Sequence, residues 1–242
     1  MRDLILAIET SAKAASAAVV TREGEIVSEC FVNAGLTHSQ TLMPMVQSAL
    51  ESAALGTADI GVYAVAQGPG SFTGIRIGIA AVKGMALGSG KGCMGVSTLL
   101  ALAENCTSLE GLICCAMDAR CSQVYNALFT CKGGVLTRLT PDRALAIDQL
   151  MEELKTFEIP IFLVGDGAKL CYNKFDQNGV HCALVGENLR YARAASVGLA
   201  AAALLKEHAS IDPSGLTPIY LRLPQAQREL KRKQEEGKKE TK

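Results

Sequence analysis

The chain repeats the pattern of its opening residues 109 positions later. In each copy an apolar run ends in an acidic residue, Glu9 or Asp118, and a hairpin with a turn glycine follows. The segments that align without a gap are 4–9 with 113–118, 19–21 with 128–130, and Gly24 with Gly133. Short apolar runs bounded by turn residues are typical of buried strands. The repeat predicts two related β-sheet lobes that face each other across a cleft, with Glu9 and Asp118 at equivalent strand ends.

Composition excludes several classes of protein. Of the 242 residues, 49% are hydrophobic, which is ample for a packed core. The 24 Lys and Arg residues are balanced by 24 Asp and Glu residues, so there is no basic field to hold nucleic acid unaided. No apolar run approaches the roughly 20 residues that span a bilayer, and the first residues do not form a signal-peptide pattern. We therefore expect a soluble, cytoplasmic protein that does not bind membranes.

Nine cysteines are spread along the chain without a C-x-x-C pair. An odd number without zinc-ligand spacing matches neither a disulfide framework nor a zinc site. Cys114 and Cys115 are adjacent in a strand-like run, where their side chains face opposite ways. We interpret the cysteines as small buried hydrophobes of a reducing compartment.

Periodicity and turn residues predict an α/β chain. Expected strands cover 4–8, 16–21, 25–32, 60–66, 112–117, 124–130, 135–139 and 161–164, with a further short strand just before 96. Expected helices cover 38–53, 75–87, a segment from 96–97 onward, 147–155 and 192–208. Thr37 and Gln40 have the spacing of a capping box for the first helix. We place the lobes at 1–108 and 109–224 and a charged tail at 225–242. The tail has seven basic and four acidic residues, a net charge of +3, and is expected to be a solvated helix that frays, with RNA or partner contact as the alternative.

The turns after the two acids carry no glycine. They consist of TSAKAA (10–15) and ARCS (119–122), whereas a turn that cradles phosphate needs glycine so that backbone N–H groups can approach. The loop GPGSFTG (68–74) is not a P-loop, because no Lys-Ser or Lys-Thr pair follows its glycines. Ser71 within it lacks the flanking glycines of a nucleophile elbow. We prefer to interpret this loop as a tight turn before a helix, with anion binding at the helix N-terminus as the alternative.

Two expected helices of the first lobe have features of a protein–protein interface. The helix 38–53 has an apolar face that consists of Leu42, Met45, Val46 and Ala49. The helix 75–87 and its flanks carry small residues at four-residue spacing, in the two runs Gly74, Gly78 and Ala80, Gly84, Gly88. Such a stripe lets another backbone approach closely. It either packs on the sheet of its own lobe or contacts another chain, and both interpretations stay open.

Seven segments together resemble the TsaB family. They are ILAIETS (5–11), THSQTLMP (37–44), GPGSFTGIRIG (68–78), Ser97–Leu99, DAR (118–120) with Val124-Tyr125, GDGA (165–168) and PIYLRLPQAQREL (218–230). The resemblance covers nearly the whole chain, and the glycine-rich segment is the most specific. TsaB proteins are similar to TsaD but shorter. The resemblance therefore implies the duplicated α/β fold of the actin-like ATPase and sugar-kinase (ASKHA) superfamily, with two β-sheet lobes and flanking helices.

The resemblance also implies a function. TsaB is a non-catalytic partner or scaffold subunit of TsaD, which works with the ATPase TsaE to form N6-threonylcarbamoyladenosine (t6A) at position 37 of tRNAs that read codons beginning with A. The implied partners are TsaD and TsaE, and tRNA is contacted only through the complex. The chain alone is expected to bind no cofactor, with ATP or ADP at the interface of the complex and a homodimer as the state without TsaD.

No catalytic or metal-binding residue is implied in this chain. Counted from the glycine loop, the metal-binding histidines of TsaD fall near Thr98 and Leu102, and an acid of its first loop falls on Lys13. The implied partner interface consists of Leu42, Met45, Val46, Ala49, Gly74, Gly78, Ala80 and Gly84, and the implied vestigial cleft of Glu9, Ser11, Ser71 and Asp118. An ATP-dependent phosphotransferase of the sugar-kinase class and an M22-type metalloprotease stay as alternative functions.

Overall fold

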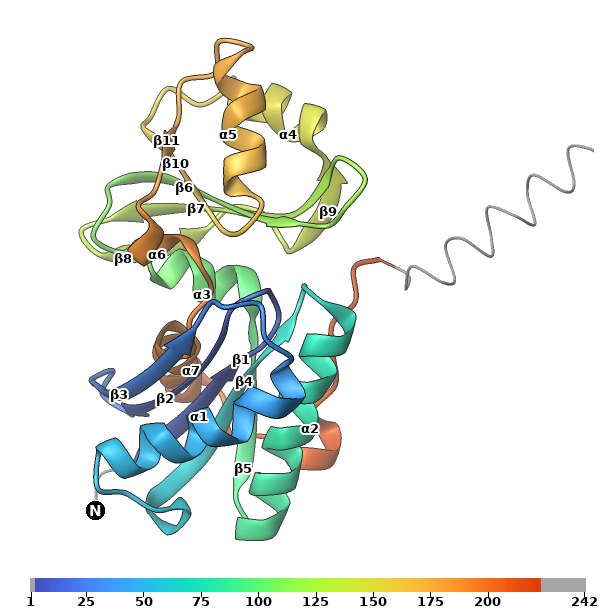
Figure 1. The fold of residues 1–242 in the computed structure, drawn as a ribbon. Helices are drawn as coiled ribbons and strands as arrows, with labels where there is room; N and C mark the ends of the chain where they lie inside the picture. Colours follow the sequence, from blue (N-terminus) through green and yellow to red (C-terminus); the bar gives the residue numbers. More distant parts are fainter. Residues whose placement is uncertain (1–2, 223–242) are drawn as a thin grey trace, which may run out of the picture.

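The structure of the chain, a computed structural model, describes residues 3–222. It contains two lobes, each built on a β-sheet with helices on its faces (Figure 1). Within the described residues, no helix is both long and apolar enough to cross a membrane. The predicted charged tail, 225–242, lies outside the described residues.

The first lobe is built on a five-stranded sheet of order β3-β2-β1-β4-β5. Its strands are β1 (Leu4–Glu9), β2 (Ala15–Thr21), β3 (Ile26–Val32), β4 (Ile60–Gly68) and β5 (Gly92–Ser97). The pairs β1–β2 and β2–β3 are antiparallel, whereas β1–β4 and β4–β5 are parallel. One face of this sheet is covered by α1 (His38–Ser52) and α2 (Phe72–Ser89), with the 3-10 turn η1 (Thr57–Asp59) between them in the chain.

The second lobe is built on a six-stranded sheet of order β11-β10-β6-β7-β8, with β9 paired to β7. Its strands are β6 (Gly111–Asp118), β7 (Gln123–Lys132), β8 (Val135–Arg138), β9 (Arg143–Ala146), β10 (Ile161–Val164) and β11 (Ala183–Leu184). One face packs against α4 (Ile147–Leu154) and α5 (Ala168–Asp176). The other face packs against α3 (Thr98–Glu104), which lies between the two sheets (Figure 1).

The two sheets share one topology. In the second sheet β6–β7 and β7–β8 are antiparallel and β6–β10 and β10–β11 are parallel, which matches the first sheet strand for strand. The two turn glycines that the repeat aligned, Gly24 and Gly133, have φ of 94° and 57°. Glycine adopts such values without strain, so both hairpins need it at this position. The predicted duplicated fold with two lobes is confirmed.

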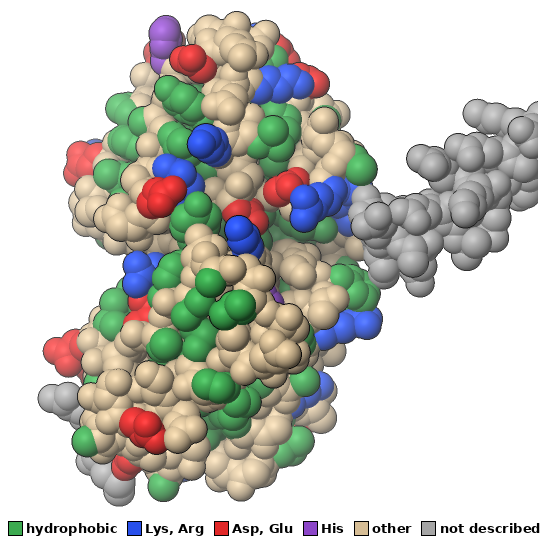
Figure 2. Space-filling view, viewed as in Figure 1, with side chains coloured by type: hydrophobic (Ala, Val, Ile, Leu, Met, Phe, Trp, Pro, Cys, Tyr) green, Lys and Arg blue, Asp and Glu red, His purple; other side chains and the backbone are tan. Residues whose placement is uncertain are grey.

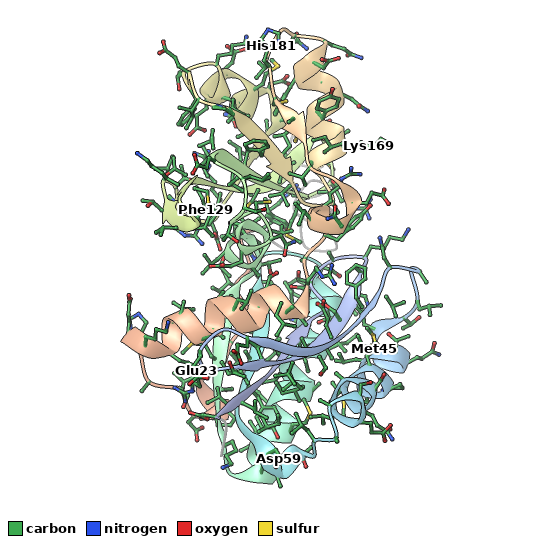
Figure 3. The ribbon with its side chains drawn as sticks, turned by 90° about the vertical axis from the view of Figure 1, so that its left-hand side faces the viewer. Glu23, Met45, Asp59, Phe129, Lys169 and His181 are labelled. Atoms are coloured by element: carbon green, nitrogen blue, oxygen red, sulfur yellow. The ribbon has the colours of Figure 1, made fainter. Side chains whose placement is uncertain are left out.

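The last long helix returns to the first lobe. Helix α7 (Ala194–Glu207) follows the second sheet in sequence, yet it packs on the face of the first sheet opposite α1 and α2, where Val197 and Ala201 share a cluster with Ile5. The first lobe therefore includes a segment that the expected boundary at 109–224 assigned to the second. Met45 and Phe129, labelled in Figure 3, are buried in the cores of the first and second lobe.

Most expected elements are present, with differences at their ends. Helix α2 begins three residues earlier than expected, because Ser71 Oγ accepts a hydrogen bond from the Gly74 N–H at 3.3 Å. The capping box at Thr37 is wrong, since its side chain makes no capping hydrogen bond. The elements that were not predicted are the 3-10 turn η1, β9, α5, β11, α6 (Glu187–Arg190) and the 3-10 turn η2 (Pro213–Gly215), all of them short.

All nine cysteines lie in the described residues and are free thiols. Cys114 and Cys115 face opposite sides of β6 and belong to separate clusters, as predicted. Burial raises the pKa of both thiols well above its ordinary value, so they stay protonated. The interpretation as buried hydrophobes is confirmed for six of the nine; Cys30 and Cys182 are half-buried and Cys121 is exposed.

Candidate functional site

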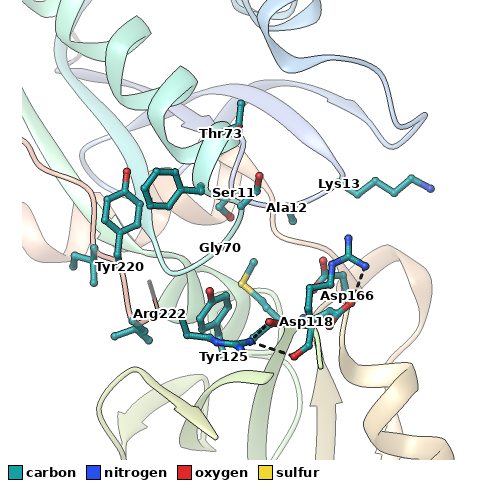
Figure 4. A pocket seen from close by; sticks show the side chains of 17 residues that line it. Ser11, Ala12, Lys13, Gly70, Thr73, Asp118, Tyr125, Asp166, Tyr220 and Arg222 are labelled. Carbon is teal, nitrogen blue, oxygen red and sulfur yellow. Dashed lines mark hydrogen bonds and ion pairs between the residues drawn. The ribbon is translucent and has the colours of Figure 1, made fainter. Parts of the chain in front are cut away.

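A cavity of about 450 Å³ lies between the two lobes, where the first hairpins of both sheets meet the N-terminus of α2 (Figure 4). Of the predicted cleft residues, Ser11 and Ser71 line it from the first lobe and Asp118 from the second, whereas Glu9 does not line it. Other lining residues include Lys13, Gly70, Phe72, Thr73, Arg120, Tyr125, Asp166, Tyr220 and Arg222. The structure therefore brings three of the four predicted cleft residues to one cavity.

Glu9 ends β1 and is fully buried. The backbone N–H of Ser11 donates a hydrogen bond to its Oε1, while Oε2 has no partner among the described residues. Burial raises the pKa of Glu9 to about 7, hydrogen bonding by Ser11 lowers it, and the negative charge of Asp166 raises it. Glu9 therefore changes its charge near neutral pH.

Folding stability is expected to depend on the ionisation of Glu9. Its pKa of about 7 in the fold lies above the ordinary value of 4.5 for a glutamate in the unfolded chain, so folding favours the protonated form. This stabilisation is fully present below pH 4.5 and is lost as the pH rises through 7; it amounts to about 3 kcal/mol at 1.36 kcal/mol per pKa unit. The free energy of unfolding of Glu9→Gln, measured in urea, should rise relative to wild type by up to that amount between pH 4.5 and pH 8. A constant difference over this range would show that Glu9 does not titrate in the fold.

Asp118 ends β6 beside a second acid, Asp166. The Asp118 N–H donates a hydrogen bond to Asp166 Oδ1 at 3.1 Å. Burial is the main cause that raises the pKa of Asp166, and the charge of Asp118 raises it further. The Arg120 N–H donates to Asp118 Oδ1 at 2.7 Å, and the Arg120 guanidinium lies 3.4 Å from Oδ2. Asp118 is thus held by its own hairpin.

The hairpin turn after Asp118 is unusual for a sequence without glycine. Arg120, Cys121 and Ser122 have φ of 66°, 55° and 54°, the left-handed region that residues with a Cβ rarely adopt. The side chains of these residues take up space where a glycine turn would leave the backbone bare for a phosphate. This supports the prediction that the phosphate cradle of the second lobe is degraded.

The turn after Glu9 is filled by the glycine-rich loop 68–74. The Ser71 N–H donates to Ser11 O at 2.6 Å, and a Cβ placed on Gly70 would lie 2.3 Å from the same oxygen. Only glycine permits this approach. The interpretation of the loop as a tight turn that packs the start of α2 closely is confirmed, and Ser71 serves as the cap of that helix.

The positions at which the resemblance implied lost metal ligands lie away from the cavity. Thr98 and Leu102 are buried in α3 between the sheets. Leu102 has no ligating atom, and a neutral threonine hydroxyl is a poor ligand for iron or zinc. Between residues 3 and 222, no group of three or more His, Cys, Asp and Glu side chains is placed to hold a metal ion.

Four of the predicted interface residues belong to the core. These are Leu42, Met45, Val46 and Ala49, each at most 4% exposed. Their prediction as partner contacts is wrong, because the sheet of the first lobe itself covers the apolar face of α1. The outward face of α1 carries Met43, which is 48% exposed.

The stripe of small residues on α2 divides into two halves. A Cβ on Gly74 would lie 2.0 Å from Thr10 O, and one on Gly78 would lie 2.5 Å from Thr10 Oγ1. These two glycines let α2 pack on its own lobe, so their prediction as partner contacts is wrong. Ala80 and Gly84 are exposed, and a Cβ on Gly84 would have no neighbour within 4 Å. The interpretation that the stripe packs on the sheet of its own lobe is thus confirmed only for its first half, Gly74 and Gly78.

The outward side of α1 and α2 forms an exposed surface. We call Met43, Ala80, Gly84 and Leu87 the α1–α2 face; Leu87 is 65% exposed. Figure 2 shows hydrophobic side chains with few charges on this side of the lobe. Exposed apolar residues gathered on one side of a lobe are typical of a protein–protein contact.

Sequence reasoning assigned no role to Asp166, Tyr220 and Arg222, which complete the cavity wall. All three lie in segments that were noticed only as part of the family resemblance, GDGA (165–168) and PIYLRLPQAQREL (218–230). Arg222 donates hydrogen bonds to the carbonyl oxygens of Ala119 and Arg120, which precede it by more than 100 residues. No local pattern predicts such a contact.

Comparison with known proteins agrees with this architecture. Residues 16–230 match the family model described as "TsaD: tRNA N6-adenosine threonylcarbamoyltransferase". The chain is 33% identical over 227 residues to the tRNA threonylcarbamoyladenosine biosynthesis protein TsaB of Bacillus subtilis, with 92% of this chain and 96% of that protein covered. It is 39% identical over 125 residues to the protein of the same name from Escherichia coli, with 51% and 53% covered.

A solved structure is similar over the whole fold. YeaZ from Pseudomonas aeruginosa has a TM-score of 0.77 and 25% sequence identity, with 90% of this chain and 100% of that chain covered. The Bacillus subtilis relative is matched nearly from end to end. The family model spans both lobes. The chain therefore belongs to the TsaB family.

Proposed function

We propose that this chain is the non-catalytic partner subunit of TsaD in the formation of t6A in tRNA. Relatives named as tRNA threonylcarbamoyladenosine biosynthesis proteins support this process. The observation that carries the partner role is the α1–α2 face, which exposes Met43 and Leu87 together with the small residues Ala80 and Gly84. A helix with small residues on its outer side lets a partner helix pack at short distance.

The interlobe cavity supports a role without catalysis in this chain. Gly70 and Ser71 fill the turn after Glu9, so this turn has no bare backbone to hold a phosphate. This disfavours an ATP-dependent phosphotransferase. The side chains of Thr98 and Leu102 disfavour an M22-type metalloprotease, because they do not supply the donor set that iron or zinc requires.

The proposal includes further partners and a location. TsaE joins the complex, ATP or ADP binds at the junction of subunits, and tRNA is contacted through the complex. Without TsaD, the same α1–α2 face supports self-association. The nine free thiols suit the reducing cytoplasm in which we place the protein.

Reconstitution of tRNA threonylcarbamoylation with TsaD and TsaE tests the proposal. Omission of this chain should lower modification at least 100-fold, while Asp118→Ala and Glu9→Ala, each checked for folding by circular dichroism, should stay within a few-fold of wild type. Full activity without the chain would contradict the partner role. A 100-fold loss in a folded Asp118→Ala variant, about 2.7 kcal/mol, would show that the cleft contributes to the reaction.

A further inference from the structure

The segment after η2 runs back across the first lobe to the mouth of the interlobe cavity. Within it, Tyr220 stacks on Phe72 of α2 with ring centroids 4.1 Å apart and an angle of 19° between the rings. The Arg76 guanidinium lies 4.0 Å from the centre of the Phe72 ring, and its Nε–H donates a hydrogen bond to Tyr220 Oη at 2.8 Å. We call Phe72, Arg76 and Tyr220 the aromatic stack.

The aromatic stack is fixed from two sides. The Ile219 N–H donates to Gln67 O at 2.8 Å, and a Cβ on Gly68 would lie 2.3 Å from Ile219 O, so the segment is pressed against the end of β4. On the other side of Tyr220, Arg222 donates hydrogen bonds to the carbonyl oxygens of Ala119 and Arg120 in the second lobe (Figure 4). Tyr220 is therefore held in place before any partner arrives, which lowers the entropy lost on binding.

The stack still has unused binding capacity. Tyr220 is 37% exposed, and Arg76 is exposed. No carboxylate in residues 3–222 pairs with Arg76, and its terminal N–H groups have no acceptor there. An exposed guanidinium with free donors attracts a carboxylate, whereas an exposed ring attracts an apolar side chain.

The stack is also continuous with the α1–α2 face. Arg76, Ala80 and Gly84 follow one another at intervals of four residues and are all exposed, so they lie along one side of α2. Leu87 continues this side toward the C-terminus of the helix. A partner helix that packs along Ala80 and Gly84 would reach the stack at its end.

We infer that the surface for the partner subunit extends beyond the α1–α2 face onto the aromatic stack, which acts as its rigid anchor. This inference rests on the proposed function. The partner that fits is the catalytic subunit, with an apolar side chain against Tyr220 and a carboxylate opposite Arg76. Tyr and Arg are enriched among the few residues that carry most of the energy of an interface.

Binding of full-length variants to purified TsaD, measured by titration calorimetry, tests the inference. Tyr220→Ala should weaken binding about 30-fold or more, and Arg76→Gln about fivefold or more, with an effect that shrinks at high salt. The matched control is Leu170→Ala, which truncates a side chain with 48% exposure on α5 of the other lobe and should stay within twofold of wild type.

The possible contrary results separate failure of the inference from failure of the proposed function. Binding of Tyr220→Ala within twofold of wild type, or a loss confined to self-association of the chain, would overturn it. If Tyr220→Ala does not fold, Arg76→Gln decides, because Arg76 is exposed and the variant keeps both aromatic rings. A different result, no binding of TsaD by the wild-type chain, would contradict the proposed function itself. If wild type binds, Gly84→Leu does not, and both stack variants bind normally, only the inference of the anchor is wrong.

Discussion

Replacement of Gly84 by leucine is expected to abolish binding of TsaD, by at least 100-fold in affinity, while the chain stays folded. Gly84 is exposed in the middle of α2, and a Cβ there meets no atom of the chain within 4 Å. Leucine adds a bulky side chain to the flat part of the α1–α2 face, where a partner helix would approach. The same change raises helix propensity by close to 1 kcal/mol, so the fold should gain stability.

Circular dichroism, melting temperature and titration with TsaD together check this prediction. Gly84→Ala is the matched control, because it gains helix propensity with only one added carbon and should bind TsaD with a smaller loss. A folded Gly84→Leu protein that binds TsaD as well as wild type would show that this side of α2 does not face the partner. A variant that unfolds would contradict the exposed position of Gly84.

Replacement of Gly78 by leucine, six residues earlier in the same helix, is expected to have the opposite effect on stability. Gly78 is buried, and a Cβ there would lie 2.5 Å from Thr10 Oγ1 and 3.2 Å from Val65 Cγ2. The Thr10 hydroxyl also donates to Gly74 O at 2.8 Å, so it has little freedom to move away. Overpacking at such a site should lower the free energy of unfolding by about 3 kcal/mol or more.

Urea denaturation of Gly78→Leu and Gly84→Leu side by side measures the contrast. Both variants add the same side chain to the same helix, so the difference between them reports packing rather than helix propensity. Gly78→Leu should unfold at a much lower urea concentration or fail to fold. Equal stability of the two variants would mean that α2 does not pack on β1 and β4 through its glycines.

Local patterns in the sequence predicted the elements of the fold well where the chain is regular. The buried strands that end at Glu9 and Asp118, and the hairpin glycines Gly24 and Gly133, follow from apolar runs and turn chemistry that neighbouring residues decide. The predicted capping box at Thr37 is wrong, because the spacing of Thr37 and Gln40 does not fix the rotamers of their side chains. Short elements such as β9 and β11 were missed, since a few residues show no periodicity.

The candidate site was predicted in part. The repeat predicted a cleft between the lobes with Asp118 in it, and Asp118 does line the cavity, but the repeat did not predict that Glu9 would be fully buried and would not line it. Periodicity identified the apolar face of α1 around Val46 without showing that the lobe's own sheet covers it. A hydrophobic stripe reports that a face is apolar, whereas its neighbour in space decides whether that face meets a core or a partner.

Residue patterns alone predict that the chain has two related lobes, that acids end the first strand of each, and that the turns after these acids lack glycine. These features depend on residue type and on spacing along the chain. Three further features become visible only in the folded chain: Gly78 faces the core and Gly84 the solvent, α7 packs on the first lobe, and Arg222 reaches the carbonyl oxygens of Ala119 and Arg120. Such contacts join residues far apart in sequence, and the packing of whole elements sets them, so no local pattern contains them.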